Sequence, residues 1–516
     1  MRAKLKAEIT DPLKRVFQTP RRTIILGGSW ENELLDMPFL QALPPEDALL
    51  RLSRRERNGF SVLLEKDEEG CVRELYAYRG LTTGFELFFA PVSGRGWILS
   101  DSFRRVLQGL PPSFRILSRT GFVDFLLFQH SPLPETPIEG IRRIGHGNLF
   151  KATAGGSVSE RQVRRLGFPE KSLPFKEGAE QTEEILGKIL GSVPGDCVNL
   201  LSGGVDSTLV QVLLGPGHRA AAATIDSPEF AFETENAKRS AELCGVFLEE
   251  KAVSESSLPE LLERQSALAA LPLPLAQVAL IASVFELDGR FFSSGFDSDS
   301  LFSLPRSKRK RVLEGVPPHS FEAESFSVSP ETELLKTLFG EKRIEERLEA
   351  RKAYVRNRLS EPDRVSRLEL GCLTSLYCSS FAVYRHLASE REKTLFTPFM
   401  DCRLVESALT IPLPERVYRQ GIFKPVLKHV LARLLPAYPK NLEKGGSGLP
   451  RTRLCAEGPF KGYFLENPPP AFLDPAKADF LLNPSWDSSM TAYRCIAWSA
   501  WEKTLSFIPE EERPWE

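Results

Sequence analysis

The chain has 516 residues, a formal net charge of −1 and 42% hydrophobic residues, enough for two or three domains of ~100–200 residues each. This charge balance excludes nucleic-acid binding through the overall electrostatics of the molecule, and the eight cysteines and six histidines show no zinc-ligand spacing. The amino terminus is charged where a signal peptide is apolar, and no run of about 18 apolar residues occurs, so we expect a cytoplasmic protein with reduced thiols and no membrane partner.

Up to about residue 165 the pattern is one of short strands separated by turn residues. The segments that carry it most clearly are residues 59–64, 74–78, 85–91 and 96–99. The sequence therefore predicts a β-rich first domain.

From about residue 177 predicted helices and strands alternate. We expect helices over 178–190, after Ser207, over 233–244 and over 275–285, and strands over 197–201, 220–225, 246–249 and 290–293. Such alternation is typical of βαβ units around a parallel sheet. Beyond about residue 325 the pattern is mainly helical, which predicts a helical elaboration of an α/β domain.

The strand predicted over 197–201 ends in the turn Ser-Gly-Gly-Val-Asp-Ser, which leads directly into a helix. Two glycines at this position let several backbone N–H groups meet at one point, where the start of a helix favours an anion. The hydroxyls of Ser202 and Ser207 add donors. Asp206 would repel a bare phosphate, so a Mg²⁺ ion is expected between its carboxylate and the phosphate oxygens. The turn predicts a site for ATP with Mg²⁺.

This turn resembles the pyrophosphate loop of the ATP pyrophosphatases, which cleave ATP between its α- and β-phosphates, and it is not a Walker loop. A second motif at residues 294–302, Ser-Gly-Phe-Asp-Ser-Asp-Ser-Leu-Phe, resembles a signature of the asparagine synthetase superfamily. The resemblance extends over nearly the whole chain. It implies that Asp206 and Asp299 bind Mg²⁺ and act in catalysis. The implied nucleotide-binding residues are Leu201, Ser202, Gly203, Gly204, Asp206, Ser207, Thr224, Ser294 and Gly295.

Two segments in the last third of the chain also resemble this superfamily. Residues 397–406 resemble its Pro-Phe-Leu-Asp-x-Arg-Leu-Val-Glu segment, which implies packing of the helical part against the nucleotide site. Residues 421–424 and 438–448 look like the region that closes over the site. There Lys440 matches the lysine that β-lactam synthetases of the superfamily place on the phosphates and the oxyanion, with Lys444 as the next candidate.

The first part of the chain resembles the glutaminase domain of the superfamily through residues 97–101 and 136–149. Such a glutaminase uses a cysteine directly after Met1 as its nucleophile, whereas this chain has Arg2. The implied organisation is a degenerate glutaminase-like α+β domain over residues 1–168. It is followed by a synthetase-like ATP-binding domain, a parallel sheet with a helical elaboration, over residues 169–516.

The reaction that the resemblance still implies is AMP-forming amide ligation, in which ATP adenylates a carboxylate and an amine then attacks the acyl carbon. Phe296 and Ser300 stand where asparagine synthetases have acidic residues, and a phenylalanine cannot remove a proton. The departure favours similarity to lasso-peptide cyclases, which form a macrolactam on a precursor peptide. Glu369, Tyr377 and Glu390 stay open as the base for the amine.

The substrate is thus expected to be a peptide or a small-molecule carboxylate. A leader-peptide-binding protein and a protease are the protein partners that a lasso-peptide assignment implies. The basic run at residues 306–311 fits an acidic peptide or phosphate, or is a solvated surface. The alternatives are a small-molecule amide or β-lactam synthetase, an ammonia-dependent asparagine synthetase, and a catalytically silent ATP-binding partner protein.

Overall fold

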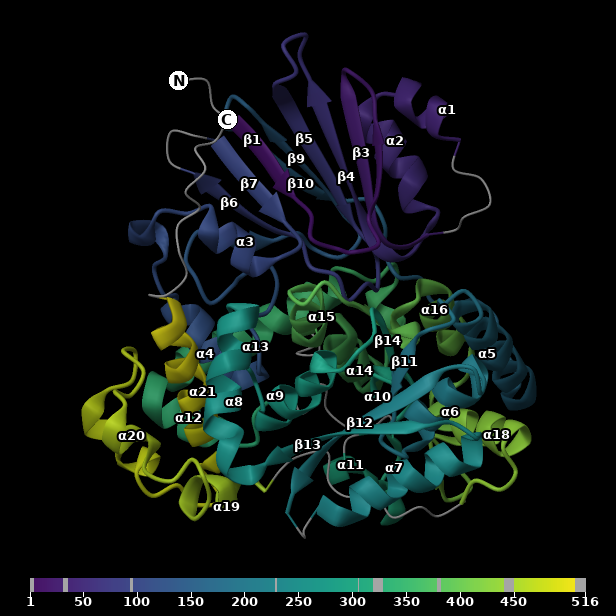
Figure 1. Cartoon of the computed structure of the whole chain (residues 1–516), viewed down its shortest axis with the longest axis vertical. Coiled ribbons are helices and arrows are strands. Elements are labelled where there is room, and N and C mark those ends of the chain that lie inside the picture. Colours follow the sequence, from purple (N-terminus) through teal and green to yellow (C-terminus); the bar gives the residue numbers. More distant parts are fainter. Residues whose placement is uncertain are drawn as a thin grey trace.

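The computed structural model describes residues 4–30, 36–92, 96–227, 230–304, 306–318, 328–377, 382–439 and 450–505. Figure 1 shows two stacked parts, with the two sheets of the amino-terminal region above and a parallel sheet surrounded by helices below. The predicted mixed α/β fold is confirmed.

The amino-terminal region consists of two sheets packed face to face. One has the strand order β1-β7-β6-β8, and the other has the order β10-β9-β5-β4-β3-β2. Apolar side chains from both sheets form a shared core that includes Phe60, Phe89 and Phe150. The strands are β1 (Lys4–Glu8), β2 (Arg15–Gln18), β3 (Arg22–Trp30), β4 (Glu56–Lys66), β5 (Val72–Arg79), β6 (Phe88–Val92), β7 (Gly96–Ser100), β8 (Arg142–Arg143), β9 (Asn148–Thr153) and β10 (Val158–Gln162).

Helices cover the outer faces of these two sheets. α1 (Met37–Ala42) and α2 (Pro45–Ser53) bury leucines against Ile24 and Leu63 of the six-stranded sheet. α3 (Phe103–Gln108) and α4 (Arg119–Phe128) belong to the core next to the four-stranded sheet. The strands predicted from alternation are confirmed, and the structure adds four short helices to a region that we expected to be mostly strands.

The lower part contains a five-stranded parallel sheet with the order β13-β12-β11-β14-β15. Its strands are β11 (Val198–Leu200), β12 (Arg219–Asp226), β13 (Leu248–Ser254), β14 (Phe291–Ser294) and β15 (Thr394–Phe396). Four of them were predicted. The edge strand β15 was not, because its three residues lie within a mainly helical pattern and pair with β14 from about a hundred positions away.

Helices lie on both faces of the parallel sheet. In sequence order they are α5 (Phe175–Leu190), α6 (Val205–Leu214), α7 (Ala231–Cys244), α8 (Leu258–Ala269), α9 (Ala276–Ala282), α10 (Ser298–Phe302), α11 (Arg306–Leu313), α12 (Thr332–Phe339), α13 (Glu341–Arg356), α14 (Arg367–Tyr377), α15 (Ala382–Ser389), α16 (Cys402–Thr410), α17 (Leu413–Val417), α18 (Pro425–Leu434), α19 (Arg451–Ala456), α20 (Tyr463–Glu466) and α21 (Ser489–Leu505). The expected helical elaboration is confirmed.

Residues 397–406, which follow β15 and are called the Pro-Phe segment below, join the two parts of the molecule. The side-chain amide of Asn58 donates to the Thr397 carbonyl at 3.2 Å, and the Thr82 hydroxyl donates to the Met400 carbonyl at 2.7 Å. Phe399 in the same segment is fully buried. The segment therefore attaches the amino-terminal sheets to the edge strand of the parallel sheet.

Buried charges reinforce the same interface. Glu86 on the amino-terminal side contacts Arg143 and lies 2.8 Å from Nε2 of His386 on α15. Asp124 on α4 accepts two hydrogen bonds of 2.7 Å from the guanidinium of Arg347 on α13. α4 also packs against α21 and α12, so one core contains residues on both sides of the predicted boundary at residue 168. The boundary itself stays a prediction.

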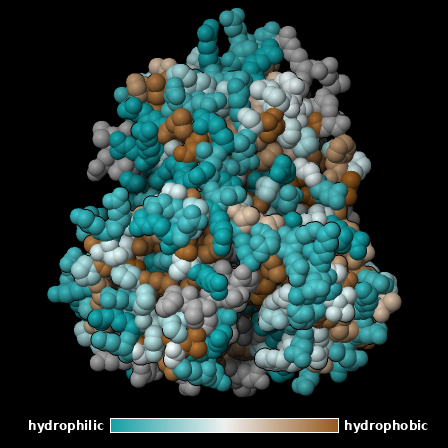
Figure 2. All heavy atoms as spheres, turned by 180° about the vertical axis from the view of Figure 1, so that it is seen from behind, coloured by the Kyte–Doolittle hydropathy of each residue, from teal (hydrophilic) through white to brown (hydrophobic). Residues whose placement is uncertain are grey.

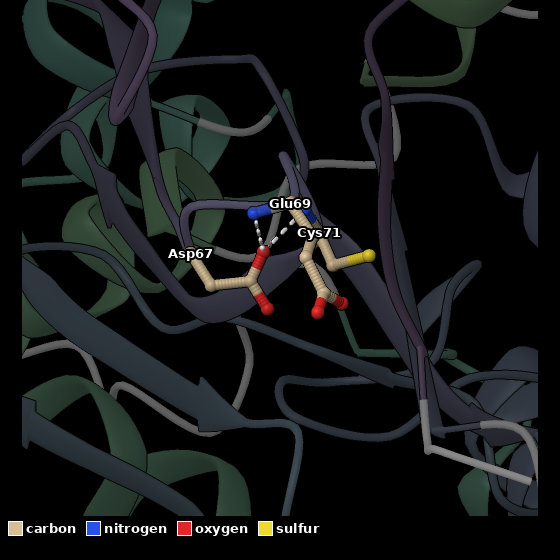
Figure 3. Close-up of side chains that lie close together, drawn as sticks. All are labelled: Asp67, Glu69 and Cys71. Atoms are coloured by element: carbon tan, nitrogen blue, oxygen red, sulfur yellow. Dashed lines mark hydrogen bonds between the residues drawn. The ribbon is translucent and has the colours of Figure 1, made fainter.

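The turn between β4 and β5 brings Asp67, Glu69 and Cys71 together (Figure 3). Oδ1 of Asp67 accepts hydrogen bonds from the backbone N–H groups of Cys71 at 2.8 Å and Glu69 at 3.1 Å. Arg73 forms an ion pair with the same carboxylate at 2.6 Å. The turn thus explains the arrangement of these side chains without an ion.

The surface in Figure 2 is largely hydrophilic, with hydrophobic side chains in scattered groups. Among the described helices, none has both the length and the apolar composition required to cross a membrane.

Candidate functional site

The two sequence motifs leave the parallel sheet side by side. β11 is the central strand, and its Leu200 pairs with Ala221 of β12 on one side and Ser294 of β14 on the other. The turn at 202–207 and the motif at 294–302 therefore start at the same level of adjacent strands. This is the carboxyl edge of the sheet, where open α/β sheets bind ligands.

The turn at 202–207 is held by its own serines and by the start of α6. Oγ of Ser207 accepts a hydrogen bond from the Ser202 N–H at 3.2 Å and lies 3.1 Å from Oγ of Ser202. The buried amide of Asn199 donates to the Ser207 carbonyl at 3.0 Å. Gly204 precedes α6 and Asp206 lies in its first turn, so the positive end of the helix dipole points into the turn.

Two glycines are required by close approaches. Gly203 has φ +73°, and a Cβ there would lie 2.3 Å from the carbonyl oxygen of Asn236 on α7. A Cβ on Gly295 would lie 2.9 Å from backbone atoms of Asp206 and Ser207. Gly295 thus allows the second motif to pack directly on the first. Turn geometry already accounts for the glycine at position 203. The glycine at position 295 is explained only by its close contact with Asp206 and Ser207.

Asp206 and Asp299 converge on the ammonium group of Lys424. Nζ lies 2.5 Å from Oδ2 of Asp206 and 2.6 Å from Oδ1 of Asp299. The side chains of Lys424 and Asp206 are 5% and 12% exposed, while that of Asp299 is 68% exposed. Burial alone would lower the pKa of Lys424, but the two carboxylates raise it above its ordinary value. Lys424 is therefore a cation at this point.

Carboxylates that share one cation also fit a divalent metal. Mg²⁺ prefers oxygen ligands and binds through one or two carboxylates together with phosphate oxygens. Asp206 and Asp299 supply such oxygens from the first turns of α6 and α10, and the serines and the α6 amino terminus lie beside them. The residues at the carboxyl edge fit the predicted metal and nucleotide.

Arg309 adds a second cation at the outer side of Asp299. Its Nη2 lies 3.7 Å from Oδ1 of Asp299, and its guanidinium lies 5.4 Å from the ring centre of Phe423. The same guanidinium donates to the Leu304 carbonyl at 2.8 Å and to Oγ of Ser303 at 2.6 Å. The predicted basic run thus forms α11 next to the site, with Arg309 fixing the chain after the second motif.

Aromatic contacts place the second motif against the rest of the molecule. The ring of Phe296 stacks on Tyr384 of α15 with a centroid distance of 4.5 Å. Phe302 packs edge-on against Phe399 of the Pro-Phe segment at 6.2 Å. Tyr438, in the region expected to close over the site, donates its hydroxyl to the Gly203 carbonyl at 2.8 Å. The Pro-Phe segment therefore contacts the second motif, and Tyr438 contacts the first.

The structure does not place every predicted residue. Leu201 is buried at the start of the turn, and Thr224 lies on β12 towards the carboxyl edge. Lys440 and Lys444 lie outside the described residues, so their predicted role stays a prediction.

The residues left open as the base are also only partly placed. The side chain of Tyr377 lies outside the described part. Glu369 forms a 3.3 Å ion pair with Arg416, and Glu390 accepts a hydrogen bond from the Ser102 hydroxyl at 2.5 Å. Both carboxylates thus have structural partners.

The segment at residues 421–424 ends in Lys424, whereas the resemblance predicts Lys440 as the catalytic cation. The local sequence around Lys424 gives little indication of its role. It shows only a lysine directly before Pro425, the first residue of α18. Lys424 has φ 55° and ψ 47°, a left-handed conformation that no sequence pattern indicates for a lysine. Its position between two carboxylates is visible only in the folded chain.

No family model matches this chain, and no curated protein matches it either.

Proposed function

We propose that the protein is an AMP-forming amide ligase that closes a macrolactam on a precursor peptide, in the manner of lasso-peptide cyclases. The observation that carries this proposal is the convergence of Asp206 and Asp299 on one buried cation beside the amino terminus of α6. The motif Ser-Gly-Gly-Val-Asp-Ser at that position supports cleavage of ATP at the α-phosphate. The lower part is then a synthetase-type ATP pyrophosphatase domain.

The turn at 202–207 and the start of α6 bind phosphate oxygens through backbone N–H groups and the hydroxyls of Ser202 and Ser207. Asp206 and Asp299 hold Mg²⁺, which neutralises charge on the phosphates when it is bound. Lys424 donates to the phosphate oxygens that become pyrophosphate. Lys440 retains its predicted role at the oxyanion.

The chemistry is a pair of substitutions at a fixed substrate. An oxygen of the substrate carboxylate attacks the α-phosphorus, the bond to the bridging oxygen of the β-phosphate breaks, and pyrophosphate leaves. The substrate amine then attacks the acyl carbon, AMP leaves with the acyl-bound oxygen, and the amine loses its proton. With the reacting groups held in one site, no ammonia source is needed, in keeping with Arg2 in place of a nucleophilic cysteine.

The paired sheets with outer helices support a degenerate glutaminase-like domain over residues 1–168, which presents the peptide rather than hydrolysing glutamine. A cytoplasmic location and partners that bind and cleave a leader peptide complete this proposal.

The test is pyrophosphate release with ATP, Mg²⁺ and candidate peptides, together with a mass measurement for a product lighter by one water. Asp206→Asn is expected to lower release by about 10²–10³-fold or more because a metal ligand is lost. The matched control is Asp196→Asn, an exposed residue before the opposite end of β11, which is expected to leave release unchanged.

The outcome also separates the alternatives. Release with a small carboxylate but with no peptide would favour a small-molecule amide or β-lactam synthetase, and release that requires aspartate and ammonia would favour asparagine synthesis. ATP binding without release for any carboxylate would favour a silent partner protein. Equal release by Asp206→Asn and the wild type would contradict the proposed site.

A further inference from the structure

Lys424 stands at the point where the two metal-binding carboxylates of the proposed function meet. Its ammonium group lies within 2.6 Å of an oxygen from each, closer to Asp299 than Arg309 is. The cation that satisfies these carboxylates in the folded chain is therefore a side chain of the protein. Any divalent ion that uses the same two oxygens has to compete with it.

The backbone limits where Lys424 can go. It has left-handed φ and ψ angles, Pro425 follows it as the first residue of α18, and its side chain is 5% exposed. α18 packs against α5 and α6, which fixes the helix. Moving the ammonium group away from both carboxylates thus leaves it buried rather than in water.

Binding of a bare metal ion would leave the ammonium group of Lys424 without an anionic partner, whereas binding of a metal with a polyphosphate would supply one. A buried ammonium group without an anionic partner is costly. Mg²⁺ alone would take both carboxylates and leave Lys424 in that state. A polyphosphate brings its own oxygens to the amino terminus of α6, beside Asp206, and so offers Lys424 a new partner as the metal enters.

We propose that Lys424 excludes free divalent cations from the site and makes metal binding depend on a polyphosphate group that takes over its ammonium. The proposal rests on the proposed function only in naming Asp206 and Asp299 as the metal ligands. Metal and polyphosphate binding are then coupled, and each raises the affinity for the other. Lys424 is in this sense a specificity-determining residue, since it selects the metal complex over the free ion.

The experiment is a titration of the full chain with Mn²⁺, without any nucleotide, in which electron paramagnetic resonance measures the free ion. If ammonium occupies the carboxylates nine-tenths of the time or more, the apparent affinity for metal is lowered at least about tenfold. Lys424→Met is therefore expected to bind one Mn²⁺ at least about tenfold more tightly than the wild type. Lys424→Gln, which keeps a polar group, serves as the second variant, and circular dichroism checks that each variant is folded.

Two further variants locate the effect. Lys188→Met removes an exposed lysine that pairs with Glu184 on α5, and it is expected to bind Mn²⁺ as the wild type does. Adding Asp206→Asn to Lys424→Met is expected to abolish the gain. Equal affinities in the wild type and both Lys424 variants would overturn the proposal, as would a gain that survives Asp206→Asn.

The result is independent of turnover. A wild type that releases no pyrophosphate with any substrate would defeat the proposed function, while tighter Mn²⁺ binding by Lys424→Met would still support the exclusion. Conversely, normal pyrophosphate release with unchanged Mn²⁺ affinities would defeat the exclusion and leave the proposed function intact.

Discussion

Two groups of close ion pairs in this molecule differ in their exposure to solvent, one at the interface below the amino-terminal sheets and one at the carboxyl edge of the parallel sheet. At the interface, Glu86 is buried together with Arg143 and His386, and each group contacts another protein group. At the sheet edge, Lys424 is buried but one of its partners, Asp299, is 68% exposed. All members of the first arrangement are buried, whereas the second has a partner that water or a ligand reaches.

This difference in exposure indicates how the chain divides stability and chemistry between the two regions. A buried pair that is cut off from solvent is costly to break, so it fixes how the two parts of the molecule dock. An ion pair with an exposed member can exchange that member for a ligand at small cost. We therefore expect substitutions in the first region to act on unfolding and substitutions in the second to act on turnover.

The largest effect is expected at the interface. Glu86→Ala removes the carboxylate between Arg143 and His386 and leaves a buried guanidinium without its anion, which should lower the free energy of unfolding by about 3–5 kcal/mol. Denaturant titration measures the change. Glu74→Ala, whose half-exposed carboxylate pairs with Lys151, is the control and should cost about 0–1 kcal/mol. Equal losses in the two variants would remove the contrast between the regions.

The second prediction concerns the sheet edge. Asp299→Asn should reduce pyrophosphate release by about 10²–10³-fold, equivalent to about 2.7–4 kcal/mol in the barrier, because a proposed metal ligand is lost. Its stability should change by less than about 1 kcal/mol, since the side chain is 68% exposed. Turnover and denaturant titration of the same preparation check both parts. A variant that unfolds easily but keeps its turnover would reverse our comparison.

The third prediction concerns how stability depends on pH through a carboxyl group of the amino-terminal region. Burial raises the pKa of Glu56, a fully buried carboxyl at the start of β4, to about 7, despite hydrogen bonds from Gly59 and Leu81 and the charge of Arg164. The folded state then holds this proton at pH values where the unfolded state has released it, so stability falls as pH rises from about 5 to about 8. The fall attributable to Glu56 is roughly 2–3 kcal/mol.

Glu56→Gln should remove that part of the pH dependence, because glutamine has no proton to release. Thermal unfolding of both proteins over the same pH range measures it. If the stabilities of the wild type and Glu56→Gln change with pH in parallel, Glu56 is not the group that makes stability fall as pH rises.

The smallest effect is expected where the regions meet. Phe399→Leu replaces a fully buried ring that packs against Phe302 with a smaller side chain. The change should cost about 1 kcal/mol of stability. Phe247→Leu is the control, since that ring is 72% exposed and its replacement should change little. A loss of turnover with no loss of stability in Phe399→Leu would show that the Pro-Phe segment acts on the site rather than on docking.

The fold was predicted well where local pattern and tertiary environment agree. Strands β11, β12 and β14 are short apolar runs bounded by turn residues, and helices α5 and α7 show helical periodicity. The edge strand β15 and helices α3 and α4 were missed. Their three to ten residues carry little local signal, and their packing partners lie far away in the sequence.

The sequence by itself determined which chemical groups the two motifs carry. The residue types at 202–207 and 294–302 predict phosphate and metal binding, and the turn after an apolar strand predicts the carboxyl edge of a sheet. Their meeting point could be expected, because carboxyl ends of neighbouring parallel strands lie at the same edge.

Only the tertiary structure decided which cation stands between the carboxylates. Lys424 is more than a hundred residues from both motifs, in a left-handed backbone conformation at the start of α18. No periodicity or turn rule connects a lysine to partners so far along the chain, because their proximity results from the packing of α18 against α5 and α6. Local sequence determines which chemical groups are present, and long-range packing determines which carboxylates pair with the same cation.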